Sequence, residues 1–121
     1  MEATKRAYLE ELGVNLEETL PRFLDSEDFY LRLLAKLVNG TYMQDVEEAL
    51  AREDYETAFR AIHSLKGASA NLGLNGLFEE TQPLTEELRN PPYNRKDIEK
   101  YLSRVKKTFD DDVAVLKKVI A

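Results

Sequence analysis

The feature that most constrains the fold is an apolar residue at every third or fourth position along the last third of the chain. These residues are Ile98, Tyr101, Leu102, Val105, Phe109, Val113, Leu116 and Val119. The spacing is typical of an amphipathic helix, because about 3.6 residues per turn bring such positions to one face. Earlier segments repeat the spacing, and none shows the alternation of apolar and polar residues that marks a half-buried strand. The sequence therefore predicts an all-α fold.

Capping residues and turn signals divide this pattern into four long helices. We predict them at about residues 26–52, 54–72, 75–90 and 94–120, with caps at Asp25 or Ser26, at Asp54 and at Asn94. The first is predicted to be one helix bent at Gly40, because its apolar stripe keeps phase across that glycine. Pro83 lies inside the third, where the continuing stripe predicts a kink rather than a break. Four such helices with short connections predict an up-down-up-down four-helix bundle.

Short extra helices are predicted before the bundle. One covers residues 3–12 and ends at Gly13, and a second covers residues 16–24. Asn15 and Glu18 have the spacing of a capping box at the start of the second helix. A chain of this length is one ordinary domain. The single domain, residues 1–121, is thus divided into an N-terminal helical cap and a four-helix bundle, at residues 1–24 and 25–120.

Composition excludes several classes of function. With no cysteine and a single histidine, the chain lacks the usual zinc ligands, so we expect neither a metal nor another cofactor. A net charge of −6 argues against nucleic-acid binding, which needs a basic surface. No apolar run approaches the roughly 20 residues of a membrane span, and the N-terminus lacks the apolar core of a signal peptide. We expect a cytoplasmic monomer that binds neither nucleic acid nor membranes.

The only histidine lies in the predicted helix at 54–72, within the sequence AIHSLKGASANLG (residues 61–73). Consecutive helical residues are ~100° apart, which places His63 roughly 130° from the middle of the apolar arc of its helix. His63 is therefore expected on the solvent side. Its neighbours on that face are Phe59, Arg60, Lys66, Gly67, Ala70 and Asn71.

Small residues beside His63 indicate that another molecule approaches it. Gly67 lies one turn further on, although glycine inside a helix costs ~1 kcal/mol relative to alanine. Two cations, Arg60 and Lys66, lie beside the imidazole and suit a side chain that carries an anion. Histidine forms covalent intermediates, and phosphoryl transfer mainly requires positioning and charge stabilisation. A lone exposed histidine on a helix usually has no function, and the spacing also allows that interpretation, with Gly67 as a helix–helix contact and two solvated charges.

The same stretch resembles the signature of histidine phosphotransfer (HPt) domains, which is H-x-L-K-G with a further glycine six residues later. His63, Leu65, Lys66, Gly67 and Gly73 occupy those positions. The similarity extends over nearly the whole chain. It implies a helical phosphorelay carrier that is not an enzyme, because it has no independent catalytic turnover.

The resemblance implies a role for several residues. His63 is the phosphoacceptor, Lys66 supports the charge of the phosphoryl group, and Gly67 provides clearance. The phosphoryl group would arrive from an aspartate of a receiver domain and leave for the aspartate of another. Implied partners are response-regulator receiver domains and a hybrid histidine kinase, with Mg²⁺ bound by the receiver. The expected partner surface is the exposed side around His63, including Phe59, Arg60, Gly67, Ala70 and Asn71.

One departure from the family concerns the helix that packs beside His63. The family often has a long polar side chain there that reaches the imidazole, whereas this sequence has Pro83 nearby. If the hairpin turns about Leu74, Thr85 lies opposite His63. Arg89 lies one turn further along the same face. Because Thr85 is short, we expect its hydrogen bond to the ring to be absent or water-mediated, and an ordinary surface position is the alternative.

Two alternative functions remain open. A helical interaction module without phosphorylation would lack the histidine or the Lys-Gly pair, and both are present. The kinase-substrate domain of a chemotaxis kinase would carry acidic residues one turn from the histidine, where this chain has Phe59, Lys66 and Gly67. The initial methionine favours a free-standing protein over a fragment of a kinase. The sequence leaves the donor, the acceptor and the direction of transfer open.

Overall fold

Helices joined by short turns make up the whole architecture. The computed structural model describes residues 1–121 and contains no strand. Its elements are α1 (Ala3–Glu11), α2 (Leu16–Thr19), the 3-10 turn η1 (Leu20–Phe23), α3 (Glu27–Asn39), α4 (Tyr42–Ala51), α5 (Tyr55–Asn71), α6 (Asn75–Arg89) and α7 (Arg95–Ile120). The prediction of an all-α fold is confirmed.

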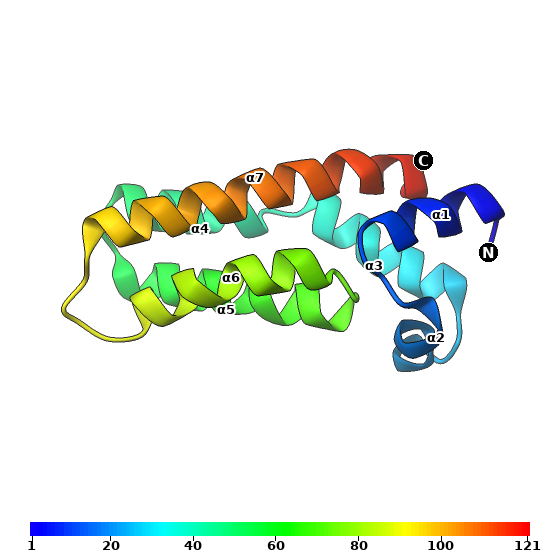
Figure 1. Ribbon diagram of the computed structural model, residues 1–121. Coiled ribbons are helices and arrows are strands. Elements are labelled where there is room, and N and C mark those ends of the chain that lie inside the picture. Colours follow the sequence, from blue (N-terminus) through cyan, green and yellow to red (C-terminus); the bar gives the residue numbers. More distant parts are fainter.

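The longer helices form an antiparallel bundle. α5 packs between α4 and α6, and α6 packs in turn on α7 (Figure 1). α7 also contacts α3, and α1 lies beside the C-terminal turns of α7. The up-down-up-down bundle is confirmed, with α3 and α4 together taking the place of its first helix.

The prediction of one continuous helix at 26–52 is wrong, because the chain leaves the helical conformation at Gly40. This glycine is extended, with φ −86° and ψ −168°, and α4 begins only at Tyr42. A Cβ atom built on Gly40 would lie 2.7 Å from the carbonyl oxygen of Lys36, so a side chain does not fit there without a backbone shift. The apolar stripe keeps phase across the break because Leu37 and Met43 enter the same core.

Capping side chains begin most of the helices where the sequence predicts. In each case a side-chain oxygen accepts a hydrogen bond from the backbone N–H three residues later, which satisfies a donor that the helix leaves free. The residues are Asn15 before α2, Ser26 before α3, Asp54 before α5 and Asn94 before α7. Of the two candidates at the start of α3, Ser26 is therefore the cap.

The second short helix is shorter than predicted. α2 ends at Thr19, and the following residues form the tighter turn η1 rather than a continued α-helix. Pro21 lies in the first turn of η1 and has no N–H for a helical hydrogen bond. α6, by contrast, continues without interruption through Pro83, as its stripe predicts.

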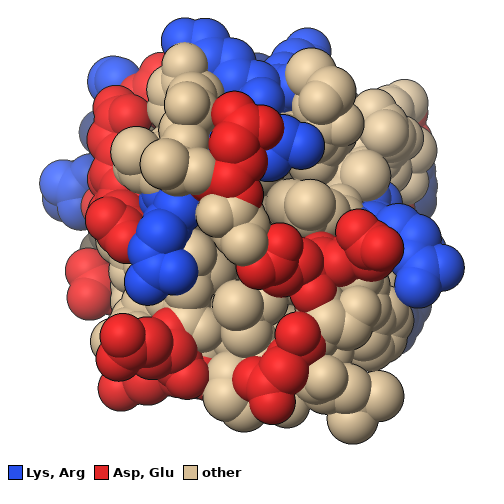
Figure 2. Space-filling model, turned by 90° about the vertical axis from the view of Figure 1, so that its right-hand side faces the viewer, with Lys and Arg blue, Asp and Glu red and all other residues tan.

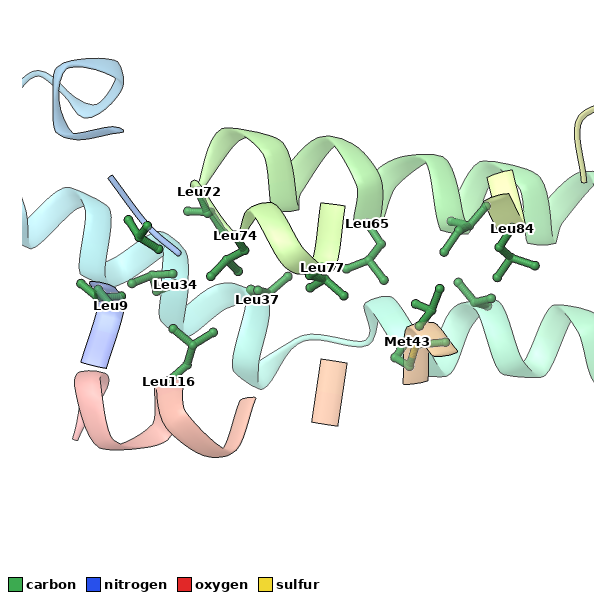
Figure 3. Packing of buried hydrophobic residues seen from close by; sticks show 14 of the residues in the cluster. Leu9, Leu34, Leu37, Met43, Leu65, Leu72, Leu74, Leu77, Leu84 and Leu116 are labelled. Carbon is green, nitrogen blue, oxygen red and sulfur yellow. The ribbon is translucent and has the colours of Figure 1, made fainter. Parts of the chain in front are cut away.

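One connected core extends through the bundle and includes the N-terminal helices. Figure 3 shows Leu9, Leu34 and Leu116 gathered where α1, α3 and α7 meet. Further along the same core lie leucines from α5 and α6, such as Leu65 and Leu77. Because burial of apolar surface is the dominant stabilising term in folding, α1 is held by the same core that orients α5.

The surface is mixed in charge at the end of the molecule where α1 to α3 lie. Figure 2 shows acidic and basic side chains interspersed with uncharged ones, and no continuous basic surface on this face. That distribution agrees with the net charge of −6. None of the helices combines the length and the apolar character that a membrane crossing requires.

Candidate functional site

α5 presents its histidine to solvent from the middle of the helix. The helix begins at Asp54, whose carboxylate accepts hydrogen bonds from the Thr57 backbone and hydroxyl, and these bonds hold the pKa of Asp54 below its usual range. Ile62 and Leu65 are fully buried, and His63 between them is exposed. The prediction that His63 lies on the solvent side of its helix, made from the rotation of ~100° per residue, is therefore confirmed.

Side chains of η1 and α3 hold the other end of α5. The Arg22 guanidinium donates to the carbonyl oxygens of Ala70 and Asn71, at 2.9 Å and 3.1 Å. The buried hydroxyl of Tyr30 donates to the carbonyl of Leu72 at 2.8 Å. The bonds to Asn71 and Leu72 satisfy carbonyls that the end of α5 leaves without a backbone partner. The helix that carries His63 is thus fixed at both ends.

Gly67 leaves open space one turn beyond His63. A Cβ atom built at this position would meet no atom of a neighbouring element within 4 Å. Gly67 is therefore not a helix–helix contact, and that interpretation of the sequence is wrong. The space beside the imidazole is free for an approaching group.

A groove of about 470 Å³ runs beside this space. His63 and Gly67 form part of its wall, together with residues of α3 and α4 near the break at Gly40. Its other lining residues are Leu33, Lys36, Leu37, Tyr42, Ser64, Ala68, Asn71 and Leu72. Sequence reasoning missed the contribution of α3 and α4, because these residues lie 20 to 30 positions before His63 and only packing brings them to it.

On its other side the imidazole lies against an aromatic ring. The ring of Phe59, one turn before His63, stacks on it with centroids 5.9 Å apart and planes 20° apart. The guanidinium carbon of Arg89, from α6, lies 5.3 Å from the centroid of the Phe59 ring. Glu86 accepts hydrogen bonds from Arg89, one of them at 3.0 Å. Arg89 therefore contacts the Phe59 ring, which in turn stacks on the imidazole of His63.

Lys66 lies on the side of α5 that faces α6. Its ammonium nitrogen is 6.0 Å from the centroid of the Phe78 ring. A hydrogen bond from Arg89, followed by the positive charges of Arg89 and Lys66, holds the pKa of Glu86 below its usual range. Together with Arg60, the site thus contains three cations and one carboxylate from the paired helices α5 and α6.

The remaining residues of the expected partner surface differ in accessibility. Arg60 is exposed and donates to the Thr57 hydroxyl of its own helix at 3.3 Å. Asn71 is exposed and lines the groove, whereas Phe59 and Ala70 are only partly exposed. The exposed surface around His63 is therefore formed mainly by Arg60, Gly67 and Asn71 on α5.

Thr85 is fully buried, so the alternative of an ordinary surface position is wrong. Its hydroxyl donates to the carbonyl oxygen of Thr81 at 2.7 Å, which commits its only proton within α6. The pairing about Leu74 does not predict the direction in which the Thr85 side chain points. Arg89, one turn later, is exposed and contacts the site through Phe59.

No group of three or more histidine, aspartate or glutamate side chains is arranged to hold a metal ion. A model of the Hpt domain family matches residues 39–116. The matched segment covers more than half of the chain and contains His63, Lys66, Gly67 and Arg89, whereas α1 to α3 almost entirely precede it. No curated protein and no solved structure gives a significant match.

Proposed function

Because the chain belongs to the Hpt domain family of two-component phosphorelays, we propose that His63 is its phosphoacceptor. In this proposal a receiver-domain aspartate donates the phosphoryl group, and a second receiver domain takes it away. A hybrid histidine kinase supplies the first receiver. The observation that carries the proposal is the exposed imidazole beside the open space at Gly67, within the segment that matches the family.

The transfer exchanges one bond to phosphorus for another. An imidazole nitrogen of His63 attacks the phosphorus in line, and a nitrogen–phosphorus bond forms. The bond from phosphorus to the aspartate oxygen breaks, and the carboxylate leaves with the electron pair. Transfer to the next receiver reverses these steps. Such a reaction requires mainly positioning and charge stabilisation. In this proposal Lys66, one turn from His63 on the same helix, supplies the charge stabilisation.

The geometry favours a carrier over an interaction module that is never phosphorylated. An interaction module has no need for an open position beside its histidine, and a glycine inside α5 weakens the helix by ~1 kcal/mol relative to alanine. A Cβ atom added at Gly67 would meet no neighbouring element, so the packing of the protein does not require a glycine there. Its small size therefore serves a molecule that approaches from outside.

The test compares the wild type with His63→Gln against a panel of phosphorylated receiver domains. We expect the wild type to be labelled and the variant not, with an adduct that is labile to acid and stable to base. Phosphoserine and phosphothreonine are stable to acid, and an aspartyl phosphate is labile to base, so the two properties together identify a bond to nitrogen. Equal labelling of the two proteins would rule out His63 as the acceptor.

The receiver is proposed to bind over the groove beside His63. Chemical-shift mapping with a receiver that labels the protein should move the resonances of Gly67, Asn71 and Lys36. An interface of this kind is small in transient signalling complexes. Shifts confined to α1 would contradict this placement.

A further inference from the structure

An exposed imidazole needs something to hold it if transfer is to be efficient. Misplacement of a reacting group by ~1 Å can lower a rate by ~10²-fold. The residue expected opposite His63, Thr85, donates its hydroxyl proton to Thr81 instead. No side-chain hydrogen bond within the protein restrains the ring of His63. Its orientation must therefore come from packing.

Phe59 provides that packing from one turn earlier on α5. Side chains of a helix lean toward its N-terminus, and residues four apart are neighbours on its surface. The imidazole accordingly lies along the Phe59 ring, with centroids 5.9 Å apart and planes only 20° apart. Phe59 itself is partly buried and packs against the core. A ring fixed by the core is a firm surface for a side chain that is otherwise free to turn.

A second contact holds Phe59 from the neighbouring helix. The Arg89 guanidinium carbon lies 5.3 Å from the centroid of the Phe59 ring, within the range of a cation–π interaction. Both oxygens of Glu86 accept hydrogen bonds from Arg89, at 3.0 Å and 3.3 Å, which fixes the plane of the guanidinium. α6 therefore reaches the imidazole through Arg89 and Phe59.

The two sides of the imidazole are thus built differently. Phe59 closes the side toward the N-terminus of α5, and Gly67 leaves the other side open. We propose that Phe59 is a positioning residue, which holds the imidazole of His63 so that the phosphoryl group enters from the side of Gly67. This inference rests on the proposed function of His63 and adds the residue that orients it.

The test uses two substitutions at Phe59 and one control. Phe59→Leu removes the aromatic face, and Phe59→Tyr keeps it. Phe109→Leu makes the same change at a partly buried aromatic residue of α7, outside the site, and reports the effect of a general loss of packing. For each variant the single-turnover transfer rate at saturating receiver, the Kd of the receiver, and the chemical shifts of the His63 ring protons are measured.

We expect Phe59→Leu to lower the saturating transfer rate about tenfold or more, since a displaced ring is badly aligned for in-line attack. The Kd of the receiver should stay close to that of the wild type, and the ring-current shift of the His63 protons should disappear. Phe59→Tyr should keep the rate and the ring-current shift. Phe109→Leu should also leave both unchanged.

Three results would overturn the inference. One is a wild type whose Phe59 and His63 ring protons show no contact in nuclear Overhauser spectra. Another is a Phe59→Leu variant that transfers as fast as the wild type. The third is a higher Kd with an unchanged saturating rate, which would make Phe59 a docking contact.

Failure of the proposed function gives a different pattern, in which no receiver labels the wild type. The same variants are then compared with phosphoramidate, which transfers its phosphoryl group to an imidazole nitrogen and releases ammonia without a receiver. A slower reaction of Phe59→Leu than of Phe59→Tyr would support the positioning role of Phe59. Equal rates would overturn it.

Discussion

Gly67 and Gly73 lie within and just after the same helix, yet a side chain added at the two positions would meet opposite surroundings. At Gly67 a Cβ atom would meet no neighbouring element within 4 Å. At Gly73 it would lie 2.6 Å from the Thr19 hydroxyl oxygen and 3.3 Å from a methyl group of Val14. Gly73 also has a φ of +78°, in the left-handed region that other residues avoid.

The difference separates two reasons for a glycine in this protein. Gly73 ends α5, and the fold itself requires it, because the backbone is left-handed there and the N-terminal segment packs against it. Nothing in the fold requires Gly67. The surroundings of a glycine, and not its position in a motif, therefore show whether the protein or its partner needs it.

The largest effect is expected from Gly67→Gln, which fills the open side of the imidazole. Transfer should fall by about 10²-fold, the scale of a misplaced reacting group. The melting temperature should be kept or raised, because glutamine forms helices better than glycine. Single-turnover transfer and thermal unfolding measure the two quantities.

Gly76→Gln is the matched control for this prediction. A Cβ atom at Gly76, in the first turn of α6, likewise meets no atom within 4 Å, and the position is outside the groove. Its transfer rate should equal that of the wild type. Unchanged transfer by Gly67→Gln, or loss of its fold, would remove the contrast between Gly67 and Gly73.

Gly73→Ala should have the next largest effect, and on stability instead of transfer. A left-handed alanine costs about 1–2 kcal/mol, and overpacking against Thr19 adds about 1–3 kcal/mol. Urea denaturation should therefore show a loss of at least ~2 kcal/mol in the free energy of unfolding. The folded fraction should still transfer phosphoryl groups at the wild-type rate.

A double variant sharpens this second test. In Thr19→Ala with Gly73→Ala the close contact with the hydroxyl is gone, whereas the left-handed backbone and the 3.3 Å contact with Val14 remain. The two substitutions together should therefore cost less than the sum of their separate effects. A Gly73→Ala protein as stable as the wild type would show that the turn after α5 adapts to a side chain.

The smallest effect is expected from Gly67→Ala. The free energy of unfolding should rise by up to ~1 kcal/mol, because alanine restores helix propensity. Transfer should fall between the rates of the wild type and Gly67→Gln, since one methyl group narrows the opening without filling it. A stability below that of the wild type would mean that Gly67 packs against something, contrary to the open space observed there.

Predictions made within a single helix were the most successful. The caps at Asn15, Asp54 and Asn94 form the expected hydrogen bonds, and the buried stripe of α5 leaves His63 on the solvent side. These features depend on neighbours three or four residues away. The break at Gly40 was missed because the apolar stripe resumes in phase, although the Lys36 carbonyl leaves no room for a side chain there.

Predictions that depended on two helices were less successful. The sequence left Thr85 and Arg89 open as the partner of His63 on α6. Thr85 points into the core, and Arg89 contacts the site through Phe59. The groove residues Leu33 and Lys36 of α3 were not anticipated. Such contacts depend on how each helix is rotated about its own axis.

By itself, the sequence determined the helical class, the start of α5, and the face on which His63 stands. Those properties follow from the fixed rotation of ~100° per residue and from hydrogen bonds within one turn. Only the tertiary structure decided that Phe59 and Arg89 form one wall of the site and that α3 borders its groove. The reason is that side chains packed in the shared core, far from His63 in the sequence, set the rotation and separation of the helices.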